Sequence, residues 1–486
     1  MSDSSSSRLT AELHTWIAGR APGTRLPSTR ALAKEHGLGP VTVQEALRAL
    51  TAEGLVETRP GVGTFIASAS ETRRVRPTDF SWQVGALGET AGRVPGGLRS
   101  TPASGVLRPT PVDAVALHNG YPGRDLLPEK AVRQALGRAA RSDAAVTAAP
   151  RAGLQELRNW FAQDLAAQTP PGVTPVTATD VTVLPGTQSG LSAIFRAVSG
   201  PGEPVVLESP TYWGAVLTGR QTGVRMVPLP TGPDGPDPTD LDRIFARTGA
   251  RLFYAQPRFT NPTGAVWSPE TRSRILEVVA RHGAFLVEDD WARDFAIDGA
   301  AASLSPMAAG DDSGRVIYLR SLSKSLSPAL RVGAVIARGP VRERILGNVG
   351  ASAMYVSPLL QAAALDVLGT PAWRSHLRTL PDRLAHRRDL LVTAVRTHLP
   401  EAELTAVPTG GLNLWLRLPD ATDLVRLVTG CEARGVIIAG GDDLFPSEPT
   451  GRFLRLNFAG PEPGRYGEAV QILGEVLREQ LRAGTR

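Results

Sequence analysis

The segment Ser321-Leu-Ser-Lys324-Ser-Leu-Ser-Pro-Ala-Leu-Arg331 surrounds a lysine with small hydroxyl side chains and ends in an arginine. The chain carries 53 Lys plus Arg, yet only three are lysines: Lys34, Lys130 and Lys324. A retained lysine indicates a need that arginine cannot meet, because an amine can condense with an aldehyde and a guanidinium cannot. A surface position suffices to explain Lys34 and Lys130. The neighbours of Lys324 instead predict a Schiff-base lysine.

Apolar strands alternate with helical patterns on both sides of this segment, from about residue 113 onward. Five predicted strands each run into a polar motif. They span residues 181–184, 205–207, 252–254, 285–287 and 316–318. The alternation predicts an α/β domain with a mainly parallel sheet, and ligands of such sheets bind at the carboxyl ends of the strands.

The polar motifs at these strand ends suit pyridoxal 5′-phosphate (PLP), the commonest aldehyde cofactor of lysines. PLP needs an anion opposite its pyridinium nitrogen, an aromatic face and a phosphate cradle. The acidic pair Asp289-Asp290 can supply the anion, and Tyr212 can supply the face. Backbone or side-chain donors for the phosphate are predicted at a helix start and around the lysine. These residues are Gly186, Thr187, Gln188, Ser321, Ser323 and Arg331.

The pattern of residues 8–67 predicts a separate winged-helix unit. Three helices and two short strands around a Gly-rich tip are expected there. They span residues 9–19, 29–36, 40–53, 55–59 and 64–67. Residues 1–112 carry a net charge of +4 out of +6 for the chain, which is compatible with a polyanion partner. A helical protein-interaction module is the alternative interpretation.

These N-terminal residues resemble the GntR-type DNA-binding domain along its full length. The motifs are Pro22-Gly-x-Arg-Leu-Pro-Ser-x-Arg30-x-Leu-Ala33, Thr42-Val-x-x-Ala46-x-x-x-Leu50-x-x-Glu53-Gly-Leu55 and Gly61-x-Gly63-Thr-Phe65. In such domains the third helix enters the major groove and the wing contacts the backbone or minor groove. The resemblance places six residues at DNA: Arg30, Thr42, Gln44, Arg59, Gly61 and Gly63. Gly39-Pro40 departs from the Ser-Arg pair that often begins this helix, so the operator cannot be inferred by analogy.

Residues 115–480 resemble fold-type I aminotransferases of class I/II. The ordered motifs are Gly186-Thr-Gln, Pro210-x-Tyr212, Asn261-Pro-Thr-Gly264, Glu288-Asp-Asp, Ser-x-Ser-Lys324 and Leu454-Arg455-Leu. The resemblance implies that Lys324 forms the internal aldimine with PLP and that Asp289, rather than Asp290, pairs with the pyridine nitrogen. It further implies that Asn261 faces the phenolic oxygen of PLP and that Arg455 holds a ligand carboxylate.

A GntR-type domain joined to an aminotransferase-like domain is the layout of MocR-type transcriptional regulators. The resemblance implies a PLP-dependent sensor of an amino acid, an amine or PLP itself. It also implies a head-to-tail homodimer that binds a double-stranded DNA operator. Two other interpretations stay open. One is a working aminotransferase with an autoregulatory DNA-binding domain, and the other is a DNA-binding protein whose large domain is an emptied dimerisation scaffold.

Residues 68–112, rich in Gly, Pro, Ser, Thr and Arg, are expected to link the winged helix to a large domain at 113–486. Trp291 stands where relatives often carry a tyrosine, and residues 145–151 lack another tyrosine common in the family.

The single cysteine, Cys431, fits a reducing cytosol. The start of the chain lacks a signal-peptide core, and no apolar run suits a membrane span. A cytoplasmic protein without a membrane partner or a metal site is expected.

Overall fold

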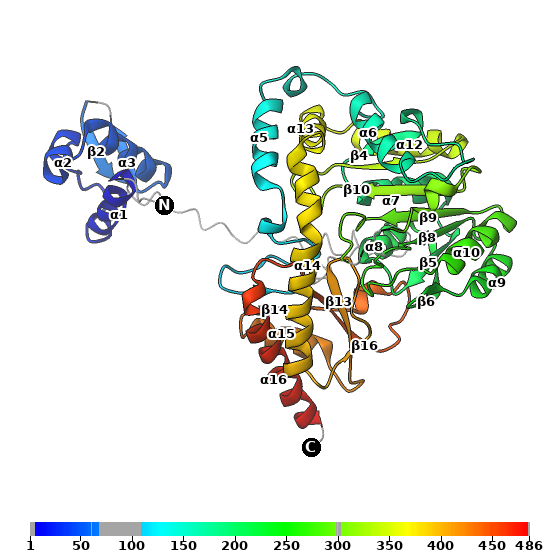
Figure 1. Cartoon of the computed structure of the whole chain (residues 1–486). Helices are drawn as coiled ribbons and strands as arrows, with labels where there is room; N and C mark the ends of the chain where they lie inside the picture. Colours follow the sequence, from blue (N-terminus) through cyan, green and yellow to red (C-terminus); the bar gives the residue numbers. More distant parts are fainter. Residues whose placement is uncertain (1–4, 60, 68–107, 298, 300–302, 485–486) are drawn as a thin grey trace. The chain divides into compact units, whose positions relative to one another are not determined.

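The structure is a computed structural model that describes residues 5–59, 61–67, 108–297, 299 and 303–484. The chain forms two compact units, Met1–Glu89 and Thr90–Arg486 (Figure 1). Most of the predicted linker, including its arginines at 73, 74 and 76, lies outside the described residues.

The N-terminal unit contains the three predicted helices and the strand pair. They are α1 (Ser5–Ala18), α2 (Thr29–His36), α3 (Pro40–Ala52), β1 (Val56–Arg59) and β2 (Gly63–Ile66). Ser28 caps α2 by accepting a hydrogen bond from the backbone N–H of Ala31, and Pro40 begins α3 at a position where no N–H is needed. Apolar residues at helical spacing, such as Leu9, Leu13 and Leu50, are buried and form the core of this unit.

The large unit is built on an eight-stranded sheet. Its order is β4 (Val181–Leu184), β11 (Gly333–Ile336), β10 (Val316–Ser321), β9 (Phe285–Asp290), β8 (Leu252–Ala255), β5 (Pro204–Ser209), β6 (Arg225–Gly232) and β7 (Gly235–Pro236). Strands β10, β9, β8, β5 and β6 pair in parallel, whereas β11 is antiparallel to both neighbours. The predicted mainly parallel sheet is confirmed. The sequence analysis did not identify β6 and β11.

Helices cover both faces of this sheet, as expected for parallel strands (Figure 1). One face packs against α7 (Thr187–Val198), α8 (Trp213–Thr222) and α12 (Pro340–Ala353). The other packs against α5 (Glu129–Ala139), α6 (Gln155–Ala166), α9 (Pro238–Thr248), α10 (Pro269–Arg281) and α13 (Pro358–Leu368). Within β8, Phe253 belongs to one core and its neighbours Leu252 and Tyr254 to the other, because side chains alternate along a strand.

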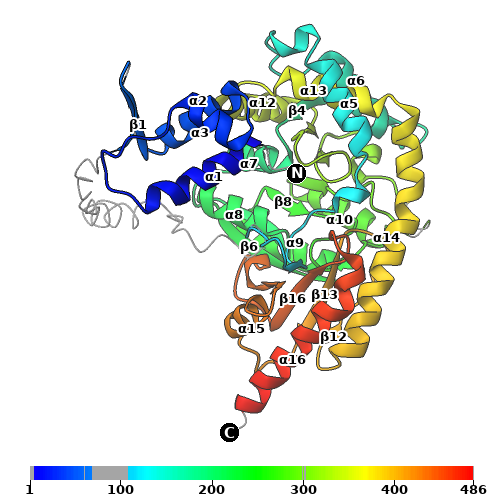
Figure 2. The same ribbon diagram turned by 90° about the vertical axis from the view of Figure 1, so that its left-hand side faces the viewer.

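A smaller four-stranded sheet completes the unit. Its order is β12 (Glu403–Leu404), β13 (Asn413–Leu418), β16 (Arg452–Asn457) and β15 (Ala439–Gly440), and a separate pair joins β14 (Val436–Ile437) to β3 (Val115–Ala116). The packed helices are α14 (Pro371–His398), α15 (Leu424–Glu432) and α16 (Tyr466–Gly484). The long α14 runs from beside α13 past the small sheet (Figures 1 and 2).

No single helix in the described part of the chain is long and apolar enough to cross a membrane. Helices α12 and α13 reach that length and composition only as a pair, and the pair is bent by 119°.

Candidate functional site

Strand ends and helix starts of the large unit meet in one pocket around Lys324. Residues at or just after the ends of β8, β9 and β10 and at the starts of α7 and α8 line this pocket. The lining residues are Tyr121, Thr187, Gln188, Tyr212, Gln256, Asp289, Trp291, Ser321, Ser323, Lys324 and Arg331. The structure therefore brings together most of the side chains that the sequence analysis assigned to a cofactor.

Lys324 is partly buried, with its ammonium 3.9 Å from the ring centre of Trp291 and 5.9 Å from that of Tyr212. Desolvation lowers the pKa of Lys324 to about 7, although the charge of Asp289 acts to raise it. A substantial fraction of the amine is then unprotonated near neutral pH, which is the form that attacks an aldehyde.

The two adjacent carboxylates have different partners. The Tyr254 hydroxyl (2.7 Å) and the Gln256 amide (2.9 Å) both donate to Oδ2 of Asp289. Its other oxygen, Oδ1, is buried and has no hydrogen-bond partner among the described residues. Burial raises the pKa of Asp289 despite these donors. A cation or N–H donor at Oδ1 would satisfy the open oxygen and favour the charged form.

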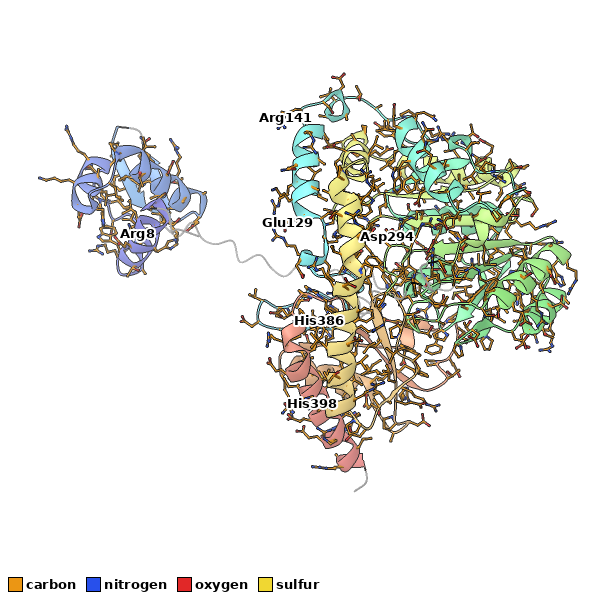
Figure 3. The ribbon with its side chains drawn as sticks, in the orientation of Figure 1. Arg8, Glu129, Arg141, Asp294, His386 and His398 are labelled. Atoms are coloured by element: carbon orange, nitrogen blue, oxygen red, sulfur yellow. The ribbon has the colours of Figure 1, made fainter. Side chains whose placement is uncertain are left out.

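Asp290, at the end of β9, instead belongs to a buried ion-pair network. It accepts from Arg258 (2.8 Å) and from the Tyr318 hydroxyl (2.7 Å). Although burial opposes ionisation, the guanidinium groups of Arg258 and Arg293 hold the pKa of Asp290 well below its usual value. Arg320 extends the charged layer by donating to Asp294 at 2.7 Å, and Figure 3 labels Asp294 within the large unit.

A loop at the start of α7 forms a cradle with an arginine. Gly186 precedes the helix with φ +90, and a Cβ atom built there would lie 2.3 Å from Nη2 of Arg331. Arg331 has φ +50, and its Nη1 donates to Oγ of Ser323 at 3.1 Å. The open N–H groups of α7, the guanidinium and the hydroxyl can bind a phosphate group. The amide of Gln188 turns away and donates to the carbonyl of Gly214 at 2.9 Å.

Two aromatic side chains in the pocket wall, Tyr212 and Trp291, differ in what they can offer a ligand. Tyr212 is the N-cap residue of α8, and burial raises its pKa. The indole N–H of Trp291 donates to the carbonyl of Phe259 at 3.1 Å, so it is not available to a ligand. A tyrosine at this position would carry a hydroxyl, and this chain has none there.

Arg455 lies buried in β16 without an acidic partner among the described residues. Its Nη1 donates to Oδ1 of Asn261 at 3.2 Å, its Nη2 donates to the carbonyl of His118 at 2.8 Å, and its Nε has no described partner. Burial lowers the pKa of Arg455 to about 10. A buried unpaired guanidinium is costly, and a ligand carboxylate would supply the missing anion.

The residues present fit PLP. Asp289 offers an unsatisfied acceptor, Gly186 leaves room that a Cβ would fill, and Lys324 lies between aromatic rings. The sequence analysis missed Tyr121, Tyr254 and Gln256, which line the pocket or orient Asp289. The position of Tyr254 and Gln256, in and just after a predicted strand, was the available signal.

The N-terminal unit places the predicted DNA residues on its surface in different ways. Arg30 and Gln44 are exposed, whereas Thr42 is half-buried. The Arg59 Nε donates to Glu57 at 3.1 Å, and its guanidinium lies 4.9 Å from the ring centre of Phe65. Both side chains of the Arg59–Glu57 pair are about half exposed, and such a surface ion pair is weak.

The two predicted wing glycines have backbones that favour glycine. Gly61 has φ +75 and Gly63 has φ +139. A Cβ atom at Gly63 would also lie 2.7 Å from Nε of Arg25. Both glycines therefore shape the wing.

Two family models match the chain. "Aminotransferase class I and II" matches residues 118–473, and "Bacterial regulatory proteins, gntR family" matches residues 6–66. Similar proteins include the uncharacterized HTH-type transcriptional regulator YdfD of Bacillus subtilis, 26% identical over 94% of this chain and 92% of that protein. The probable rhizopine catabolism regulatory protein MocR of Rhizobium meliloti is 29% identical over 93% of this chain and 88% of that protein.

Among solved structures, the large unit is similar to LysN, an alpha-aminoadipate aminotransferase from Thermus thermophilus. The TM-score is 0.71 at 26% identity, over 83% of this chain and 99% of that chain. LysN was solved in complex with N-(5′-phosphopyridoxyl)-L-leucine.

Proposed function

This chain belongs to the class I and II aminotransferase family and carries a gntR-family domain, and from that membership we propose that it is a PLP-dependent transcriptional regulator. The observation that carries the proposal is the presence of both parts on one chain: a DNA-reading winged helix and a pocket with the donor set of PLP. The similarity to MocR along nearly the whole chain supports the same function. In this proposal the large domain senses an amino acid, an amine or PLP.

The proposed cofactor site assigns one task to each group of residues. Lys324 would hold the aldehyde end of PLP, Asp289 would accept from the pyridine nitrogen, and Tyr212 would cover a ring face. Asn261 faces the phenolic oxygen. The phosphate is held by Gly186, Thr187, Gln188, Ser321, Ser323 and Arg331. Bound PLP supplies an aldehyde that captures amines and a ring that withdraws electrons.

Effector binding is proposed to act on DNA binding through a shift between two arrangements of the protein. Arg455 holds the carboxylate of an amino acid effector, because it is a buried cation without a described counter-ion. The effector shifts the equilibrium only by its difference in affinity for the two arrangements. A head-to-tail homodimer in the cytoplasm is the proposed form of the protein.

The cofactor part is tested by absorbance. The purified protein supplemented with PLP should be yellow, and Lys324→Ala should abolish the colour because the covalent link is lost. Lys324→Arg is the matched control, since it keeps the charge but cannot condense. A visible band that is unchanged in both variants would disprove the assignment of Lys324.

The DNA part is tested on a duplex selected by the full-length protein from a randomised double-stranded library. Affinity should fall steeply with salt, and Arg30→Ala should weaken it. Equal binding of selected and random duplexes would contradict a specific operator. Rapid multiple turnover with an amino donor and a keto acid would instead establish a working aminotransferase.

A further inference from the structure

One buried amide lies between the two halves of the proposed ligand site. Gln256 directly follows β8, is 1% exposed and contributes to the pocket wall. Its side-chain Nε2 donates to Asp289 at 2.9 Å, and its Oε1 accepts from the backbone N–H of Asn261 at 2.8 Å. Both ends of a single amide are therefore committed to residues proposed to contact the cofactor.

On the side of Asp289, Gln256 determines which oxygen stays open. Its amide and the Tyr254 hydroxyl both donate to Oδ2, and Oδ1 is left without a described partner. Two donors on one oxygen fix the rotation of the carboxylate. They also favour its charged form, which the pyridine nitrogen requires as a partner.

On the other side, Gln256 reaches the carboxylate arginine through one residue. The backbone N–H of Asn261 donates to Oε1 of Gln256 (2.8 Å), and the side-chain Oδ1 of Asn261 accepts from Nη1 of Arg455 at 3.2 Å. Asn261 is 2% exposed and Arg455 is 1% exposed, so water does not replace these bonds readily. The path Asp289, Gln256, Asn261, Arg455 is continuous.

The backbone of Gln256 is itself anchored. Its N–H donates to the buried carboxyl of Glu208 at 2.7 Å, and its carbonyl accepts from the Thr260 hydroxyl at 2.8 Å. The same Glu208 accepts from the indole N–H of Trp267 at 3.1 Å. The backbone of Gln256 is therefore held at both its N–H and its carbonyl, and its side-chain amide links Asp289 and Asn261 from that point.

We propose that Gln256 is a positioning residue that fixes Asp289 and Asn261 relative to each other and thereby couples the carboxylate arginine, Arg455, to the partner of the cofactor nitrogen. This inference rests on the proposed PLP site and adds a route by which a ligand carboxylate changes the state of the cofactor. A carboxylate that takes up the guanidinium of Arg455 loosens its bond to Asn261. The change then reaches Asp289 through Gln256.

The test uses the full-length protein freed of PLP and three variants. Gln256→Leu removes both hydrogen bonds, and Gln256→Glu keeps the acceptor for Asn261 but turns the donor to Asp289 into a second acceptor. Tyr254→Phe is the matched control, because it removes the other donor to Asp289 and leaves the path to Asn261 intact. The thermal midpoint of each apoprotein verifies folding.

Two quantities are measured by visible absorbance: the dissociation constant of PLP and the pH midpoint of the bound cofactor's band, with and without propionate. Propionate is a carboxylate without an amine, so it cannot react with the cofactor. In Gln256→Leu and Gln256→Glu, PLP should bind roughly ten- to a hundredfold more weakly, since a hydrogen bond to a charged group is lost. Propionate should shift the midpoint in the wild type and in Tyr254→Phe but not in Gln256→Leu.

Each other outcome has a definite meaning. A propionate shift of wild-type size in Gln256→Leu would overturn the coupling, and so would a wild type that does not respond to propionate. PLP affinity within twofold of the wild type in both Gln256 variants would overturn the positioning role. If Gln256→Leu fails to fold, the PLP affinity of Gln256→Glu decides whether Gln256 is a positioning residue. A wild type that forms no visible band with PLP would refute the proposed function itself.

Discussion

Neutralising each of the adjacent carboxylates, in Asp289→Asn and Asp290→Asn, should give opposite phenotypes. The two side chains are neighbours in β9 and are both about 3% exposed, so burial alone does not distinguish them. Their partners do. Asp289 lines the pocket around Lys324 and accepts from the neutral donors Tyr254 and Gln256, whereas Asp290 is paired with the guanidinium of Arg258.

For Asp290→Asn the expected loss is in folding stability. The Arg258 side chain is 7% exposed and would keep its charge in the interior without its counter-ion. Breaking a buried pair from one side costs about 3–5 kcal/mol. With an unfolding entropy of about 2 cal/mol/K per residue, a loss of about 4 kcal/mol lowers the Tm of a domain of this size by roughly 5 °C.

For Asp289→Asn the expected loss is in cofactor affinity. An asparagine oxygen can still accept from Tyr254 and Gln256, so the apoprotein should keep its Tm within roughly 1 °C. The amide nitrogen would then occupy the place of the open oxygen and present a donor to the pyridine nitrogen. PLP should bind about ten- to a hundredfold more weakly.

The assay is differential scanning calorimetry of the PLP-free proteins, followed by titration with PLP at constant pH. The reasoning is refuted if Asp290→Asn loses the visible band with an unchanged apoprotein Tm while Asp289→Asn melts several degrees lower. Equal effects on both quantities would also contradict the division of labour between the two carboxylates.

Three further outcomes are expected. Gly186→Ala should weaken PLP binding about tenfold or more, because its Cβ would displace Arg331, whereas Gly172→Ala, with φ +86 and open space, should leave the PLP dissociation constant unchanged in the same titration. The rate of band formation with PLP in stopped flow should rise with pH through about 7 and then level off, because Lys324 reacts only when unprotonated; a rise continuing toward pH 10 would contradict the lowered pKa. Gly63→Ala should weaken binding of the selected duplex in gel shift by straining the wing, and wild-type affinity would contradict this.

Much of the large domain could be predicted from local patterns. The five predicted strands coincide with β4, β5, β8, β9 and β10, because a fully buried parallel strand needs an uninterrupted apolar run. Strand β6 was missed since its prolines and polar residues break that pattern, and the four-residue strand β11 was missed as well. Their pairing is decided by long-range contacts.

The candidate site was predictable as a set of residue types and not as a geometry. The sequence indicated Lys324 through its rarity among cations and Asp289 through its place in an acidic pair. It did not reveal that the indole N–H of Trp291 donates to the carbonyl of Phe259, or that Arg59 donates to Glu57. These hydrogen-bond partners depend on how the chain folds back on itself, and the periodicity of the sequence does not encode that.

The sequence by itself determined the chemistry available to this protein: a lysine whose neighbours predict a Schiff base, an ordered series of polar motifs after buried strands, and a gntR-family domain before them. The tertiary structure decided which atoms are free to use that chemistry. Asn261 and Arg455 lie 194 positions apart in the chain and yet share a hydrogen bond. Gln256 ties the first of them to Asp289, and only the packing of β8, β9 and β16 places those groups within reach of one another.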